Sequence, residues 1–415
     1  MHGGSAAGAG WQPGVAQVRV GEVKPLTDTL QRTPLHSRHL ALGARLVPFA
    51  GWELPVQYVG IMAEHRAVRG AAGLFDVSHM GEVRVRGPRA LQAVDLLCAN
   101  DPRRLAPGGA MYTPLCAADG GTVDDCVVYC LEAATEFLFV VNAGNRAGDV
   151  AWMAEVLDRR GLGAGEATLV DESAATGLLA LQGPRATGVL ARVVAPEVAA
   201  QLAAVAPFHF LRAVRIADQP CLVARTGYTG EDGWEIACPA AGVGAVWDAL
   251  LAAGAPDGLQ PAGLGARDTL RTEAALALYG HELSAAINPL EAGLGRFVRL
   301  EGRGGAARGF EGAEALRRVL ALGPSRRLVG LLPVPPAIAR PGAEVRDAAG
   351  ARIGVVTSGT FAPTLGRGVA LALCRHGAAP EGARLLVDVR GRAVAAEVVP
   401  LPFYRRRRLP DAETT

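Results

Sequence analysis

The stretch GGTVDDCVVY, residues 120–129, has the pattern of a glycine turn that leads into a β-strand with two adjacent carboxylates at its start. Side chains of a strand point alternately to the two faces of its sheet. Asp125 is therefore expected on the same face as Val127 and Tyr129, and Asp124 on the opposite face. A carboxylate that shares a surface with a phenol suits an aromatic ligand carrying basic nitrogens. The alternative is that both acids only occupy a turn and a strand edge.

A second stretch, RTGYTGEDGWE at residues 225–235, lies between two apolar strand candidates. Its three glycines permit positive φ angles and close approach of the backbone. The same turn contains Tyr228, Trp234 and several charged residues, among them Glu235. Polar and aromatic groups that converge on a rigid loop are typical of a small-molecule site. The alternative is a plain hairpin in which the glycines only serve the turn.

A third stretch, PAGLGARD at residues 261–268, leads into a helix predicted over 266–279. Arg267 and Arg271 are four residues apart and project from the same side of that helix. A guanidinium group at this place can grip the planar acceptor edge of a ligand or a carboxylate. It can equally hold domains together by pairing with one of three acids: Asp268, Glu273 or Glu235.

Outward from these stretches, short strands and helices alternate up to about Leu300. Further helices are expected at 148–160, 241–253 and about 314–320, and strands at 81–85, 123–129, 137–141 and 221–225. Beyond Leu328, short β-type runs separated by Pro, Gly and Asp turns predict a small all-β domain or barrel. We therefore predict an α+β protein with five segments: a loose extension (1–31), a body (32–300), a connecting segment (301–327), a β-barrel (328–405) and a tail (406–415).

Composition excludes several classes of function. The chain has 415 residues, 42 basic and 40 acidic, and this balance argues against a nucleic-acid partner bound by phosphate neutralisation. No apolar run reaches the roughly 18 residues of a membrane span, so a soluble globular protein is expected. Lys24 is the only lysine, which excludes Schiff-base and P-loop chemistry from the body of the chain. The seven cysteines form no CxxC pair, which favours reduced, buried thiols.

The remaining polar motifs point to no further chemistry. His36, His39 and His79 lack metal-ligand spacing with a third donor, so no metal site is predicted. There is no GxSxG, no HExxH, and no GxGxxG between a strand and a helix. The run Arg405–Arg408 is interpreted as a solvated tail, and the alternative is a docking patch for an acidic partner.

The motifs, in their order along the chain, resemble those of the glycine cleavage T-protein (aminomethyltransferase) family. The likeness extends from about Arg32 to Tyr404. The matching stretches are RTPLHSRHLALGARLVPFAGWELP (32–55), GLFDVSHMGEVRVRGP (73–88), GGAMYTPLCAADGGTVDDCVVY (108–129), FVVNAGNR (139–146), LQGPRA (181–186), ARTGYTGEDGWE (224–235), PAGLGARDTLRTEAALALYGHEL (261–283), NPLEAGL (288–294) and VTSGTFAPTLGRGVALA (356–372).

The resemblance implies a three-domain, cloverleaf-like folate-binding fold, with two interleaved subdomains in the body and a β-rich C-terminal barrel. It also implies transfer of an aminomethyl carbon from the lipoyl arm of H-protein to tetrahydrofolate, which gives 5,10-methylenetetrahydrofolate, ammonia and dihydrolipoyl H-protein. Lipoylated H-protein, P-protein and L-protein would be its partners. No nucleic acid, membrane or metal is implied. The location would be cytoplasmic for a bacterial-type chain, or the mitochondrial matrix for a eukaryotic one.

By the same resemblance the essential aspartate of the family falls on Asp125, in agreement with the strand parity. An ionised carboxylate near the folate nitrogens can orient the ligand and stabilise developing positive charge. Glu235 and Arg267 would meet the pterin edge. The residues implied around the ring and beside it are Tyr112, Val127, Tyr129, Tyr228, Met80 and Asn142.

The sequence departs from the family pattern after the NPLEAGL stretch, where the family commonly has an aromatic residue and this chain has Gly295-Arg296-Phe297. Arg296 could stack on the ligand or pair with an acid, or Phe297 could take the aromatic role. The family's Gly-Lys-Glu-Ala-Leu segment lacks its lysine here, which fits the general absence of lysine. Within the superfamily a folate-dependent demethylase stays open. A non-enzymatic folate-binding relative is disfavoured because its KGCYxGQ motif is replaced by TGYTGEDG.

Overall fold

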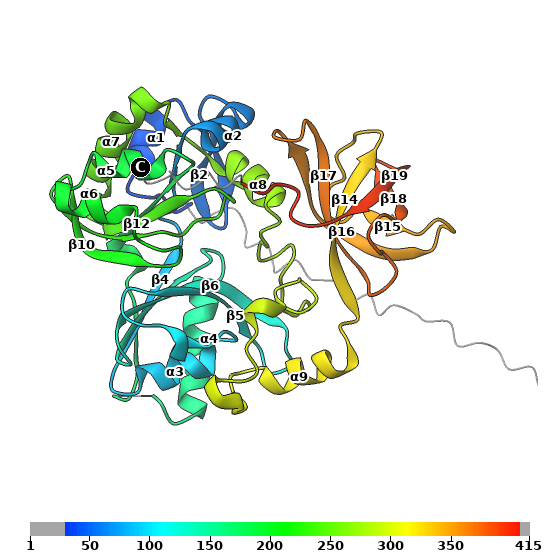
Figure 1. Cartoon of the computed structure of the whole chain (residues 1–415), viewed down its shortest axis with the longest axis horizontal. Coiled ribbons are helices and arrows are strands. Elements are labelled where there is room, and N and C mark those ends of the chain that lie inside the picture. Colours follow the sequence, from blue (N-terminus) through cyan, green and yellow to red (C-terminus); the bar gives the residue numbers. More distant parts are fainter. Residues whose placement is uncertain (1–29, 164, 407–415) are drawn as a thin grey trace, which may run out of the picture.

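The computed structural model describes residues 30–163 and 165–406, and in this part the chain forms three lobes arranged like a cloverleaf (Figure 1). Two lobes are mixed helix and sheet, and the third is an all-β barrel. The α+β class and the C-terminal barrel predicted from the sequence are confirmed. The predicted extension and tail lie outside the described residues, apart from Leu30, Gln31 and Arg406.

The first lobe is built on a six-stranded sheet. In spatial order its strands are β10 (Phe210–Ile216), β11 (Gln219–Ala224), β12 (Gly233–Pro239), β9 (Thr176–Gln182), β3 (Gly73–Asp76) and β13 (Gln260–Pro261). The helices of this lobe are α1 (His36–Ala41), α2 (Ile61–Gly70), α5 (Ala186–Ala191), α6 (Pro196–Leu202), α7 (Val243–Gly254) and α8 (Leu264–Glu273). A two-stranded hairpin, β1 (Arg45–Phe49) with β2 (Trp52–Gln57), precedes α2.

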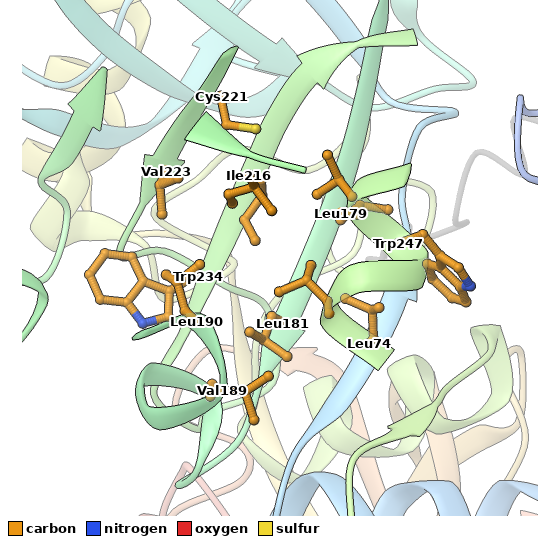
Figure 2. Close-up of a cluster of buried hydrophobic side chains, with 14 of the residues drawn as sticks. Leu74, Leu179, Leu181, Val189, Leu190, Ile216, Cys221, Val223, Trp234 and Trp247 are labelled. Atoms are coloured by element: carbon orange, nitrogen blue, oxygen red, sulfur yellow. The ribbon is translucent and has the colours of Figure 1, made fainter. Parts of the chain in front are cut away.

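One face of this sheet carries the largest apolar core of the body. Leu74, Leu179 and Leu181 pack from the central strands against Trp234 and Trp247, and both indole rings are completely buried (Figure 2). Burial of side chains of this size contributes about 2–3 kcal/mol each, so this core holds β12 firmly in place. The strand that carries Glu235 is thereby fixed from its other face.

The second lobe is a five-stranded sheet that the chain forms between β3 and β9, before it returns to the first sheet. In spatial order the strands are β5 (Ala110–Cys116), β6 (Thr122–Glu132), β7 (Glu136–Val141), β4 (Gly81–Arg86) and β8 (Thr168–Asp171). The helices α3 (Ala90–Leu97) and α4 (Arg146–Arg159) cover one face, where Val83, Val85 and Val128 are fully buried. The opposite face of this sheet faces the first lobe.

The third lobe is a closed six-stranded barrel reached through α9 (Ala313–Leu322). Around the barrel the strands are β14 (Arg326–Val334), β17 (Arg367–Arg375), β16 (Arg352–Ala362), β15 (Glu344–Arg346), β18 (Arg384–Val389) and β19 (Arg392–Val399). Short 3-10 turns complete the described chain: η1 (Pro102–Arg104), η2 (Ser173–Ala175), η3 (Ala240–Gly242), η4 (Ala255–Asp257), η5 (Gly295–Phe297) and η6 (Arg303–Gly305).

The helix predicted over 266–279 is shorter than expected, because α8 ends at Glu273. Ala275 takes a left-handed backbone conformation with φ of 52°. The N–H of Leu276 then donates to the carbonyl of Arg271, which closes the helix end as in a C-terminal cap. The apolar spacing of Ala274 and Leu278 therefore continued past the real end of the helix.

Helix α8 lies between the first lobe and the barrel (Figure 1). The buried Arg271 donates from Nη1 to Glu282 at 2.9 Å, and from Nη2 to Asp268 at 2.7 Å and to Ser358 of β16 at 2.9 Å. Of the two arginines singled out in the sequence, Arg271 thus has the structural role. Among the described residues, no helix has the length and apolar composition needed to cross a membrane.

Candidate functional site

The site lies on the face of the second sheet that α3 and α4 leave uncovered. The register pairs Tyr112 of β5 with Val127 of β6, and Val127 with Val140 of β7. Asp125 and Val127 are half-buried on this face, whereas Asp124 is completely buried on the face toward α4. The alternation predicted for residues 124–129 is therefore present in the strand.

Asp125 is held by one hydrogen-bond donor on each carboxylate oxygen. The Tyr112 hydroxyl donates to Oδ2 at 2.9 Å, and the side-chain amide of Asn142 donates to Oδ1 at 3.1 Å. Burial and the neighbouring charge of Asp124 raise the pKa of Asp125 to about 7. A carboxyl group with this pKa can hold or release a proton near neutral pH.

A second group of polar side chains comes from β12 and the loop before it. Thr226 and Tyr129 both donate their hydroxyls to Oε2 of Glu235. Each described hydrogen bond to this carboxylate reaches Oε2, so Oε1 is left to accept from another partner. This loop was singled out in the sequence, but Thr226 was not recognised as a partner of Glu235.

Arg267 stacks on an aromatic ring and does not pair with an acid. Its guanidinium carbon lies 4.7 Å from the ring centre of Tyr228, whose hydroxyl donates to the carbonyl of Ala277. Within the part of the chain that the structure describes, no ion pair involves Arg267. Its donors are therefore available to a ligand, in contrast to those of Arg271.

The two groups belong to one site, because the charges on each side act on the other. The pKa of Tyr228 is raised by burial and by the charge of Asp125, while Arg271 and Arg267 oppose the shift. The pKa of Tyr112 is raised above its usual range by burial and by Asp125, with a further contribution from Tyr228. Met80 lies at the margin, packed against the apolar cluster beneath α8 that also includes Ala266 and Leu270.

The segment where the sequence departs from the family pattern borders this site. The ring of Phe297 packs edge-on against Tyr112, with 4.7 Å between ring centres. Arg296 is exposed and lies over the outer face of Phe297, 4.6 Å from its centre. Phe297 therefore contacts an aromatic side chain of the site, and Arg296 stacks on Phe297.

These side chains together suit a planar heterocyclic ligand. A planar heterocycle with neighbouring N–H donors and a carbonyl needs a carboxylate acceptor and a cationic donor, with aromatic walls beside them. Glu235 Oε1 and the guanidinium of Arg267 provide the first two, and Tyr112, Tyr129 and Tyr228 the walls. Within residues 30–163 and 165–406, no group of three or more His, Cys, Asp or Glu side chains is placed to hold a metal ion.

Glu82 lies in the same cross-strand row as Val127, since β4 pairs it with Val140. It is almost completely buried, and neither carboxyl oxygen has a hydrogen-bond partner among the described residues. Burial and the nearby charge of Asp171 raise the pKa of Glu82 to about 9. At neutral pH Glu82 is therefore an uncharged acid.

This burial predicts a dependence of stability on pH. The unfolded chain loses the Glu82 proton near pH 4.3, but the folded chain keeps it up to about pH 9, so folding becomes less favourable as the pH rises between these values. In Glu82→Gln there is no proton to lose. The variant should gain stability relative to wild type by up to about 1.4 kcal/mol per pH unit. Urea unfolding at about pH 5.5 and about pH 8 measures the effect, and exposed Glu155→Gln is the control. Parallel pH profiles for Glu82→Gln and wild type would contradict a buried neutral acid.

Two family models match the chain, and between them they cover most of its length. The GCVT N-terminal domain matches residues 35–302, and the glycine cleavage T-protein C-terminal barrel domain matches residues 326–405. The chain therefore belongs to the glycine cleavage T-protein family.

Its relatives agree over nearly the whole chain. It is 48% identical over 381 residues to an aminomethyltransferase of Symbiobacterium thermophilum, covering 92% of this chain and 99% of the relative. Identity to an aminomethyltransferase of Moorella thermoacetica is 49% over 377 residues, covering 91% and 98%. The crystal structure of glycine cleavage system aminomethyltransferase T from Bartonella henselae superposes with a TM-score of 0.80 at 34% identity, covering 91% of this chain and 99% of that one.

Proposed function

We propose that this aminomethyltransferase transfers the methylene carbon from the aminomethyl-lipoyl arm of H-protein to tetrahydrofolate. The products are 5,10-methylenetetrahydrofolate, ammonia and dihydrolipoyl H-protein. The observation that carries the proposal for this site is the placement of Asp125. Its carboxylate is held between Tyr112 and Asn142, in the same site as Oε1 of Glu235 and the guanidinium of Arg267, neither of which has a side-chain hydrogen-bond partner among the described residues.

Glu235 and Arg267 are assigned to the pterin edge. Glu235 would accept hydrogen bonds from ring N–H and amino groups, and Arg267 would donate to the ring carbonyl. The residues assigned to the ring walls and their surroundings are Tyr112, Val127, Tyr129, Tyr228, Met80 and Asn142. Bound tetrahydrofolate supplies the nitrogen nucleophile that accepts the carbon.

Asp125 is assigned the catalytic role. As a carboxylate it orients the ligand nitrogens and stabilises positive charge that develops beside it. Because its pKa is about 7, it is ionised above neutral pH and protonated below. We therefore expect the transfer rate to rise with pH through about pH 7.

The partners assigned to this chain are lipoylated H-protein and, within the glycine cleavage system, P-protein and L-protein. The cytoplasm of a bacterial cell is the location that goes with this assignment. The five-segment division predicted from the sequence, with a body at 32–300 and a barrel at 328–405, is kept as part of the proposal.

The four-arginine run is assigned no docking role. Arg406 lies 3.3 Å from Asp232 at the molecular surface, and Arg407 and Arg408 lie outside the described residues. Exposed ion pairs contribute less than about 1 kcal/mol. Replacing Arg405–Arg408 with serine should therefore change the KM for H-protein by less than about fivefold, the factor that corresponds to about 1 kcal/mol. A tenfold rise in that KM would instead support docking of an acidic partner.

The experiment that tests the assignment compares carbon donors in the presence of tetrahydrofolate. Aminomethyl-lipoyl H-protein should give 5,10-methylenetetrahydrofolate and ammonia, whereas N-methylated glycines should give no product. Lipoyl H-protein without the aminomethyl group is the blank. Product from the methylated amines alone would replace the assignment with a folate-dependent demethylase. Folate binding without product from any donor would point to a non-enzymatic relative.

A further inference from the structure

Behind Asp125 the second lobe buries two more carboxyl groups that face each other. Asp124 is 0% exposed on β6, and Asp149 is 1% exposed in the first turn of α4. Oδ2 of Asp149 is buried without a hydrogen-bond partner among the described residues, and the carboxylate of Asp124 acts directly on this group. Two adjacent carboxylates offer only acceptors, so this contact needs a proton.

The hydrogen bonds on Asp124 lead directly to Asp125. The backbone N–H and the side-chain amide of Asn142 donate to Asp124 at 3.0 and 2.8 Å, and the Asn145 amide donates at 2.8 Å. The same Asn142 amide also donates to Asp125 Oδ1. A chain of contacts thus runs from Asp149 through Asp124 and Asn142 to Asp125.

We propose that Asp149 and Asp124 share a single proton, and that this acid pair is a positioning device that fixes Asn142 and, through it, Asp125. The proposal rests on the assigned role of Asp125. It makes Asp149 a positioning residue, since it is fully buried on the face away from the ligand site.

The other titratable groups near the pair bring no positive charge that could neutralise a second carboxylate. Cys126 lies on the same face of β6 as Asp124, Asp125 lies next to Asp124 on the opposite face, and Tyr279 comes from the segment after α8. Burial raises the pKa of both Cys126 and Tyr279, so neither adds charge at neutral pH. Among the described residues no arginine or histidine forms an ion pair with Asp124 or Asp149. Two like charges at this separation cannot both be retained in a buried site.

Burial and the charge of Asp124 raise the pKa of Asp149 to about 10, which places the shared proton on Asp149. Asp149 is then the neutral member of the pair. A second charge would raise the pKa of Asp125 further and leave it protonated at neutral pH. The shared proton thus allows Asp125 to ionise at neutral pH.

Substitutions of Asp149 distinguish between a proton shared by the two carboxyl groups and a second negative charge on the pair. Asp149→Asn keeps a donor and adds no charge, so kcat should stay within about threefold of wild type with the acid limb of its pH profile unmoved. Asp149→Ala removes the donor to Asp124, so kcat should fall by about tenfold or more while folate affinity stays within about twofold. The Asn variant thus retains the activity that the Ala variant loses. Thermal unfolding transitions of both variants should show that both are folded.

The opposite results would overturn the proposal. If Asp149 were ionised, Asp149→Asn would remove a negative charge and move the acid limb to lower pH. Equal impairment of the Asn and Ala variants, or no impairment of Ala, would also contradict a positioning role. Asp124→Asn removes the charge of the pair, so it provides the positive control for a shift to lower pH.

A readout that does not require turnover keeps this test independent of the proposed function. Infrared difference spectra of wild type against Asp149→Asn at about pH 8 should show loss of one neutral carboxylic-acid band, since Asp149 would be protonated there. A difference confined to carboxylate bands would reject the shared proton. If the wild type is inactive with H-protein but the acid band is present, the assigned function is wrong. The shared proton between Asp149 and Asp124 is then still supported.

Discussion

Asparagine in place of Asp125 is expected to slow methylene transfer by about 10²–10⁴-fold, the usual contribution of a positioned acid or base. The amide keeps the size of the carboxylate and can still accept from Tyr112. It carries no charge, so it neither stabilises positive charge on the ligand nor changes protonation. Folate affinity should stay within a few fold, because the pterin edge is assigned to Glu235 and Arg267.

Rate and affinity are measured separately for this variant, by single-turnover kinetics and by equilibrium titration with tetrahydrofolate. The rise of the wild-type rate through about pH 7 should be absent in Asp125→Asn, since its cause is ionisation of this residue. Asp218→Asn is a matched control, because the side chain of Asp218 is 98% exposed on the β10–β11 turn. A variant that keeps both the rate and its pH dependence would remove Asp125 from the mechanism.

Glu235→Ala should weaken tetrahydrofolate binding by about 10–100-fold, which corresponds to the loss of charge-assisted hydrogen bonds. The substitution removes the free Oε1 acceptor and leaves the hydroxyls of Thr226 and Tyr129 without their shared partner. At saturating folate the rate should recover most of its wild-type value, because Asp125 and its donors lie on a different sheet.

The titration needs a control for general effects of removing a carboxylate. Glu155→Ala serves, since its side chain is 72% exposed on α4. Glu235→Gln retains an acceptor without the charge, and its dissociation constant should lie between those of wild type and Glu235→Ala. Unchanged affinity for tetrahydrofolate in Glu235→Ala would contradict the assignment of Glu235 to the pterin edge.

Local patterns predicted much of this architecture. The alternation along residues 124–129 placed Asp125 with Val127 and Tyr129, and the glycine-rich turn drew attention to Glu235 and Tyr228. Both signals are local, since strand parity and turn glycines act within a few residues. Spacing alone could not divide the roles of Arg267 and Arg271, because the partners of Arg271 come from Glu282 and from Ser358 of the barrel.

The contacts that the sequence did not reveal are those between distant segments. Phe297 reaches Tyr112 across 185 positions, and Thr226 meets Glu235 only because β11 and β12 form a hairpin. No local sequence pattern singles out Asp149, which lies in the first turn of α4. Only the packing of α4 onto β6 turns it into a buried partner of Asp124.

The decisive experiment for the proposed transfer mixes the enzyme, in excess, with aminomethyl-lipoyl H-protein and tetrahydrofolate in a single turnover. We expect 5,10-methylenetetrahydrofolate and ammonia in equal amounts and at the same rate, with both signals lost together in Asp125→Asn. Ammonia release without the folate product, or no product at all from wild type that binds folate, would contradict it.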